Sequence, residues 1–105
     1  MIKIKRLSDS IDYSDKYRVI LDNKIIMELV NGELRDYNVT EGEHTLKIIS
    51  DNYVSEVVKF NIYDGQIIEF ECKPDHKDNK VSLFTRKIFL GKLGISLTKK
   101  TDFYL

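Results

Sequence analysis

The strongest structural signal in the chain lies in residues 17–49, which read YRVILDNKIIMELVNGELRDYNVTEGEHTLKII. Apolar and polar side chains alternate along this segment, and turn residues interrupt the alternation at residues 22–24, at Asn31-Gly32 and at residues 40–43. A period of two is the repeat of a half-buried β-strand, and Asn, Asp and Gly accept the backbone angles of tight turns. The segment therefore predicts consecutive antiparallel hairpins, with Asn31-Gly32 as a type I′ turn that has positive φ at Gly32.

The same alternation continues on both sides of this segment. It recurs in residues 2–5, 58–62 and 68–72, and Asp64-Gly65 is a further expected turn. Strands that follow one another at intervals of roughly 8–12 residues, with turn signals between them, are typical of a β-sandwich or barrel. The predicted fold class is all-β, an antiparallel β-sandwich of about seven short strands. Residues 1–105 are expected to form a single domain.

Residues 81–105 fit this pattern least well, because strand-like runs overlap there with apolar residues at helical spacing. Gly91 and Gly94 would each weaken a helix by about 1 kcal/mol relative to Ala. We therefore expect strand and loop in this part of the chain, with residues 102–105 as a closing strand.

The composition favours a folded, soluble β protein. The 105 residues are 42% hydrophobic and 32% charged, Ala is absent, and Ile, Val, Tyr and Phe are frequent. This composition supplies enough apolar surface to argue against intrinsic disorder, and it favours strands over helices. We find no apolar run of signal-peptide length at the start, and none approaches the roughly 18 residues of a membrane span. Since Cys72 is the only cysteine, an intramolecular disulfide is excluded and a cytoplasmic location is expected.

Three motifs between Tyr17 and Pro74 carry a family resemblance. They are Tyr-Arg-Val-Ile-Leu-Asp-Asn-Lys from residue 17, Val-Thr-Glu-Gly-Glu-His-Thr-Leu-Lys-Ile from residue 39, and Asp-Gly-Gln-Ile-Ile from residue 64. They resemble the Asp-Gly hairpin, the Gly-Glu-His-Thr turn and the later Gly-Gln of PEGA-like modules, small Ig-like β-sandwiches of bacterial proteins. Asn23 departs from that pattern by replacing the turn glycine, and Val39-Thr40 stands where a proline often precedes the second turn. The resemblance implies a non-catalytic domain, often part of envelope or multidomain proteins, and it supplies no catalytic residues.

His44 is the residue best suited to acid–base chemistry, because an imidazole titrates near neutral pH. It follows the turn at residues 40–43 and shares the register of Leu46 and Ile48. We therefore expect a structural histidine at the start of a strand, with its ring hydrogen-bonded to a neighbouring turn or carboxylate.

Two segments contain metal-ligand residue types. Cys72 and His76 make half a zinc site, and the sequence has no second Cys/His pair to complete it. Asp9, Asp12 and Asp15 could offer oxygen ligands to calcium, but their spacing of three differs from that of an EF-hand-like loop. We expect no bound metal and no cofactor, and we expect Cys72 to be a small buried side chain of the core.

Motifs for nucleophilic catalysis and phosphate binding are missing from the sequence. It contains no Gly-x-Ser-x-Gly, no Gly-rich phosphate loop ahead of a helix and no Walker-type lysine. We therefore expect that the protein is not an enzyme.

Charge is distributed unevenly although the formal net charge is zero. Residues 9–79 carry 8 basic and 16 acidic side chains, a net charge of −8, whereas residues 80–105 carry 6 basic side chains and one acidic, a net charge of +5. We expect the N-terminal strand and the C-terminal segment to pair side by side, so that their basic residues form a contact patch. Its predicted members are Lys3, Lys5, Arg6, Arg86, Lys87 and Lys92. Scattered, solvated lysines are the alternative interpretation.

The expected function is that of a non-catalytic interaction module whose partner is another protein or an envelope component. The alternative is a binder of nucleic acid or of an anionic membrane surface that uses the basic patch at the two chain ends. Aromatic residues interleaved with the basic residues of the C-terminal segment are compatible with this alternative. No small-molecule substrate is indicated.

Overall fold

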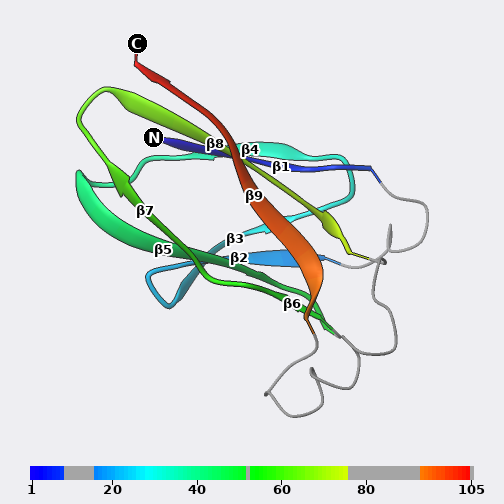
Figure 1. Ribbon diagram of the computed structural model, residues 1–105. Helices are drawn as coiled ribbons and strands as arrows, with labels where there is room; N and C mark the ends of the chain where they lie inside the picture. Colours follow the sequence, from blue (N-terminus) through cyan, green and yellow to red (C-terminus); the bar gives the residue numbers. More distant parts are fainter. Residues whose placement is uncertain (9–15, 52, 76–92, 105) are drawn as a thin grey trace.

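The computed structural model describes residues 1–8, 16–51, 53–75 and 93–104. These residues form nine strands and no helix (Figure 1). The strands are β1 (Ile2–Arg6), β2 (Tyr17–Leu21), β3 (Lys24–Leu29), β4 (Leu34–Tyr37), β5 (Gly42–Ile49), β6 (Val54–Ser55), β7 (Val58–Ile62), β8 (Gln66–Pro74) and β9 (Leu93–Tyr104). The predicted all-β class is confirmed. The described part of the chain contains no apolar helix of membrane-spanning length.

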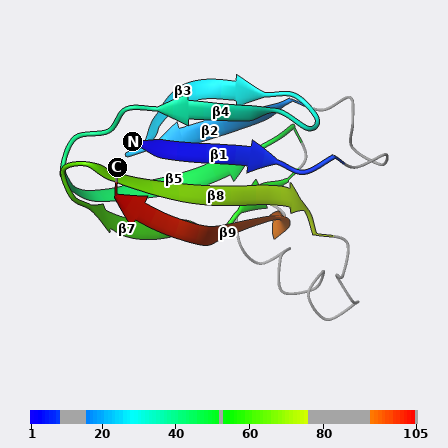
Figure 2. The same ribbon diagram turned by 90° about the horizontal axis from the view of Figure 1, so that it is seen from above.

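The strands belong to one sheet that curves into a nearly closed barrel (Figures 1 and 2). Neighbouring strands follow the order β3-β2-β5-β6-β9-β8-β1-β4, and β7 pairs with β5. Two pairings are parallel, β1 with β8 and β6 with β9. The finer prediction of an antiparallel sandwich with about seven strands is not confirmed, because alternation marks strands without naming their partners.

The interior of the barrel is filled by the alternate, inward side chains of the strands. The buried core consists of Ile2, Ile4, Tyr17, Val19, Leu21, Met27, Leu29, Leu46, Ile48, Phe60, Ile62, Ile68, Phe70, Cys72 and Ile95. Phe60 of β7 and Phe70 of β8 pack with their ring centroids 5.2 Å apart and their planes tilted by 59°. Full burial of each large apolar side chain contributes roughly 1.5–3 kcal/mol, so this core is the main source of stability.

The predicted turns at residues 22–24 and at Asn31-Gly32 are correctly located, but the type predicted for Asn31-Gly32 is wrong. Asp22 and Asn23 have φ values of 50° and 68° and join β2 to β3 as a type I′ hairpin. Gly32 has the predicted positive φ, 79°, whereas Asn31 does not share it, as in a type II turn. Since β3 and β4 are not paired in the described sheet, the prediction of a hairpin at Asn31-Gly32 is wrong. The partner of β4 is β1, so this turn redirects the chain instead of closing a ladder.

The turns at residues 30–33 and 63–66 share one construction. In each, the backbone N–H of the fourth residue donates to the carbonyl of the first, at 3.1 Å and 3.0 Å respectively. The side-chain Oε1 of Glu33 or Gln66 accepts, at 3.0 Å, the backbone N–H of the first residue. Gly65 has a φ of 80°, close to that of Gly32. Each turn joins two strands that are not paired with each other in the described sheet, β3 with β4 and β7 with β8.

The N-terminal and C-terminal strands lie on either side of β8 (Figure 2). Ile68 is opposite Ile2 of β1 on one side and opposite Asp102 of β9 on the other. The Met1 ammonium group donates to the Gln66 carbonyl at 3.0 Å. The expectation that the two ends pair directly is wrong, because β8 lies between them. The predicted closing strand at residues 102–105 is, within the described residues, the end of the 12-residue strand β9.

Arg6 connects the two ends of the strand order, β3 and β4, from inside the barrel. Its side chain is 1% exposed, and Nη1 donates to the carbonyl of Leu29, the last residue of β3, at 2.9 Å. Its guanidinium carbon lies 3.8 Å from the centroid of the Tyr17 ring on β2. Its backbone N–H donates to the Glu33 carbonyl at 2.9 Å, just before β4. A single residue of β1 thus contacts β2, β3 and the start of β4.

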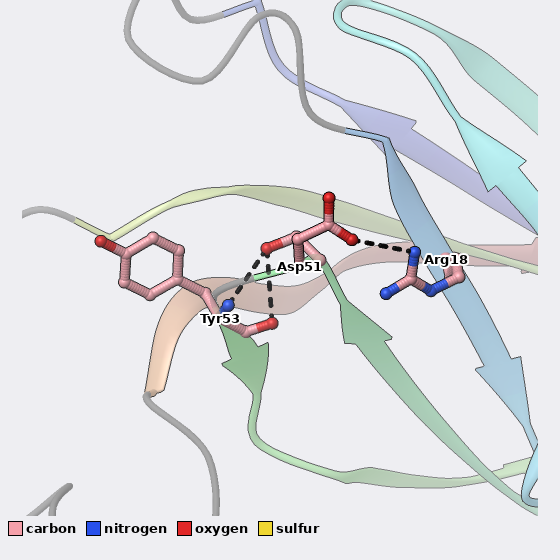
Figure 3. Close-up of polar contacts among 4 residues, drawn as sticks. Arg18, Asp51 and Tyr53 are labelled. Carbon is pink, nitrogen blue, oxygen red and sulfur yellow. Dashed lines mark hydrogen bonds and ion pairs between the residues drawn. The ribbon is translucent and has the colours of Figure 1, made fainter.

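Arg18 on the outer surface provides a contrast (Figure 3). Its Nη1 lies 3.4 Å from Asp51 Oδ1, and the two side chains are 29% and 76% exposed. Beside this pair, Ser50 Oγ accepts the Tyr53 N–H at 3.2 Å and shapes the turn between β5 and β6. The Tyr53 ring packs over Gly94, where an added Cβ would overlap it. The exposed ion pair of Arg18 and Asp51 is of a kind that contributes about 0–1 kcal/mol to stability.

Replacing Arg6 by Met should lower the free energy of unfolding by about 2 kcal/mol. Methionine fills much of the same space, but it leaves the Leu29 carbonyl without this donor and removes the cation above the Tyr17 ring. Arg18→Met is the matched control, and its cost should stay below about 0.5 kcal/mol. Urea unfolding of both variants measures the difference, and equal costs would contradict a closing role for Arg6.

Candidate functional site

The structure contains an open hollow of about 530 Å³. Its volume is within the range of small-ligand sites, roughly 300–1,000 Å³. The β2–β3 turn, the start of β5 and the end of β7 form its walls. These three segments lie at the end of the barrel that carries the chain termini (Figures 1 and 2). It is lined by Asp22, Glu43, His44, Thr45, Lys59, Phe60 and Asn61.

The pairing of β5 with β7 sorts these residues onto two faces. Glu43 is opposite Asn61, His44 is opposite Phe60, and Thr45 is opposite Lys59. Because side chains alternate along a strand, His44 and Phe60 face the core while the other four point outward. We call these four residues, Glu43, Thr45, Lys59 and Asn61, the polar block. It places a carboxylate, a hydroxyl, an ammonium group and an amide on one small surface.

His44 is held by both of its ring nitrogens. Nδ1 lies 2.6 Å from Asp22 Oδ2, and Nε2 lies 2.6 Å from the Thr40 carbonyl oxygen. A carboxylate and a carbonyl only accept hydrogen bonds, so this geometry favours a ring with a proton on both nitrogens. Asp22 also accepts the Thr45 backbone N–H at 2.9 Å, which docks the β2–β3 turn on β5. The predicted structural role of His44 is confirmed.

The two partners change each other's titration. The hydrogen bond with Asp22 is the largest cause that raises the pKa of His44 above 6.5, and burial acts against it. The hydrogen bond with His44 and the Thr45 N–H lower the pKa of Asp22 below 3.8. Both shifts favour the charged pair at neutral pH.

Exposed aromatic side chains continue from the hollow toward the C-terminal strand. Asn61 Nδ2 donates to the Tyr63 hydroxyl at 3.4 Å, and Tyr63 is 52% exposed. Gln66, which is hydrogen-bonded to the backbone of Tyr63, lies opposite Tyr104 of β9. Phe103 and Tyr104 are 40% and 60% exposed. We call Tyr63, Phe103 and Tyr104 the aromatic border.

Only three members of the predicted basic patch, Lys3, Lys5 and Arg6, lie within the described residues. Arg6 is buried in the barrel, so its assignment to a surface patch is wrong. Lys3 and Lys5 remain outside the core, but they lie opposite Glu69 and Glu71 in the parallel register of β1 and β8. The other three predicted members, Arg86, Lys87 and Lys92, lie outside the described residues.

Cys72 is fully buried, as predicted from its register. Desolvation raises the pKa of its thiol to about 12, although the nearby Arg6 acts in the opposite direction. Its predicted neighbour His76 and the acidic loop at residues 9–15 lie outside the described residues. Within the described ranges, no group of three His, Cys, Asp or Glu side chains is arranged to hold a metal ion.

Sequence reasoning located His44 but missed the hollow beside it. The polar block alternates with core residues in both β5 and β7, which is the ordinary pattern of any half-buried strand. Only the antiparallel register of the two strands brings the four side chains together.

The charged pair of His44 and Asp22 should make stability depend on pH. Because the pKa of folded His44 is raised above 6.5, its contribution is complete below pH 6.5 and is lost as pH rises through the folded pKa. The Asp22 contribution is present above 3.8 and is lost as pH falls through its lowered pKa. Unfolding midpoints measured across this range should decline on the alkaline side in the wild type and decline less in His44→Gln. Parallel curves for the two proteins would refute the assignment.

The Cys72 thiol should react slowly with a thiol reagent in native buffer and rapidly in denaturant, because burial and a raised pKa both suppress the thiolate. Absorbance of the released chromophore measures both rates. Similar rates in the two conditions would mean that the register of β8 is shifted by one residue.

No protein-family model matches the chain, and searches of curated proteins and of solved structures also returned no match.

Proposed function

We propose that this protein is a non-catalytic binding module that contacts another protein or an envelope component through the terminal end of its barrel. The observation that carries the proposal is the aromatic border, Tyr63, Phe103 and Tyr104, next to the polar hollow. Aromatic residues are enriched in the cores of protein interfaces, where a rigid ring contributes contact area at low cost in conformational entropy. Tyr104 lies opposite Gln66, which is hydrogen-bonded to the backbone of Tyr63, and Phe103 points to the other face of β9. Exposed rings therefore flank this end of the barrel on both faces of β9, which favours recognition.

The backbone that presents these rings is well fixed. Tyr63 belongs to a turn in which Gln66 makes two hydrogen bonds to its backbone. Phe103 and Tyr104 end a strand that pairs with β8 from Gln66 to Pro74. A preorganised surface loses little freedom on binding, which favours affinity.

The reactive groups of the described residues support binding more than catalysis. Both nitrogens of His44 are hydrogen-bonded, so neither is open to act as a general base toward a substrate. The Cys72 thiol lies in the core, away from any ligand. We further propose the likeness to PEGA-like and Ig-like bacterial modules and a cytoplasmic location, where a buried free thiol stays reduced.

The alternative, a basic patch that binds nucleic acid or an anionic membrane, has less support. Arg6 is unavailable to it, and Glu69 and Glu71 offset the charges of Lys3 and Lys5. We therefore favour the terminal end of the barrel.

Site-specific photo-crosslinking tests the proposed surface. A diazirine amino acid placed at position 63 or 103 should give covalent adducts of higher mass in cells. The same residue at position 34 is the control, because Leu34 is a 55% exposed apolar side chain that lies opposite Lys5, toward the Arg6 end of the barrel. Adducts at 63 and 103 but not at 34 are expected. Identical adducts at all three positions, or none at any, would contradict the proposal.

A further inference from the structure

We propose that the hollow binds an uncharged oligosaccharide, with the polar block contacting its hydroxyl groups and Tyr63 contacting a sugar ring. This inference rests on the proposed binding function and names the class of ligand.

The charges around the hollow balance one another. Asp22 and His44 form a charged pair with an Nδ1–Oδ2 distance of 2.6 Å. Glu43 and Lys59 contribute one negative and one positive side chain on the outer face. A site without an excess of either sign gains nothing from long-range attraction of an ion, so it favours an uncharged ligand.

The polar block offers donors and acceptors that neighbouring residues do not use. Within the described part of the chain, the side chains of Glu43, Thr45 and Lys59 have no hydrogen-bond or ion-pair partner. Asn61 donates one side-chain N–H to the Tyr63 hydroxyl, and its side-chain carbonyl oxygen and second N–H stay available to a ligand. A sugar hydroxyl both donates and accepts, so it can satisfy all four kinds of group. An apolar ligand would bury these groups without hydrogen-bond partners, which is unfavourable.

Tyr63 adds a flat apolar surface at the edge of the hollow. It is 52% exposed, and the hydrogen bond from Asn61 restrains its hydroxyl end. The carbon–hydrogen face of a pyranose ring can lie against such a ring while the sugar hydroxyls reach the polar block. The hollow is open, not enclosed, so a chain of sugars can extend along it.

A second hollow, on the outer face of β8 and β9, offers a contrasting chemistry. It measures about 200 Å³ and includes Lys73, Lys100, Ser96 and Thr98. Its Glu71 carboxylate lies 3.6 Å from Lys100 Nζ and would repel an anion. The larger hollow at the end of the barrel is therefore the better-supported ligand site.

Titration of the ¹⁵N-labelled protein with two soluble probes, chitotetraose and maltotetraose, tests the inference by NMR. We expect saturable shifts in the amides of residues 43–45 and 59–63 with at least one probe. Asn61→Ala and Tyr63→Ser should each weaken binding at least about tenfold. Tyr37→Ser is the matched control, because Tyr37 is a 37% exposed tyrosine on β4, outside the polar block and the aromatic border, and its affinity should equal that of the wild type.

The dependence of binding affinity on ionic strength distinguishes an uncharged ligand from a charged one. Binding of an uncharged probe should be unchanged between about 0.05 and 0.5 M salt, whereas exposed charge–charge attraction is strongly screened over that range. Unfolding midpoints of the variants establish that they remain folded, and Glu43→Gln, which keeps the shape of the side chain, serves if Asn61→Ala does not fold.

Absence of saturable shifts with both tetrasaccharides would overturn the inference, as would binding that Asn61→Ala and Tyr63→Ser leave unaltered. If crosslinks still form at position 63 while neither sugar binds, the ligand class is wrong and the binding function stands. If neither experiment detects a partner, both proposals fail.

Discussion

Arg6 donates a hydrogen bond from inside the barrel to the carbonyl of Leu29, and this contact joins β1 to β3 where the described sheet has no ladder. The first and last strands of the order, β3 and β4, are not paired with each other among the described residues. A buried cation is costly unless polar and aromatic groups surround it, and here a carbonyl and the Tyr17 ring do so. The Arg6 side chain thus links β1 to β3 where the described residues of β3 and β4 form no backbone ladder.

Closure near Arg6 leaves the opposite end of the barrel free to carry a site. β1 runs from the terminal end, where Met1 contacts Gln66, to Arg6 at the other end. The β7–β8 turn, the end of β9 and the start of β5 therefore gather around the termini (Figures 1 and 2). The buried contacts of Arg6 and the candidate site therefore lie at different ends of the same strands.

The charged pair of His44 and Asp22 links the fold to the candidate site. It joins the β2–β3 turn to the start of β5, and the Thr45 N–H extends the same contact. These contacts position the start of β5, which carries Glu43 and Thr45 of the polar block. The lowered pKa of Asp22 and the raised pKa of His44 both favour the charged form of this pair.

Local alternation in the sequence determined where most strands lie and the burial of Cys72, and the Asn-Gly turn signal determined the positive φ of Gly32. Alternation also placed Arg6 in phase with Ile2 and Ile4, but a charged residue at a strand end was assigned to the surface on the strength of its charge alone. The parallel pairing of β1 with β8 and the register of β5 against β7 were decided only by the tertiary structure. Alternation fixes which face a side chain occupies over a few residues. The partner of a strand depends instead on where segments distant in sequence dock around a common core, as Met1 does beside Gln66, 65 positions away.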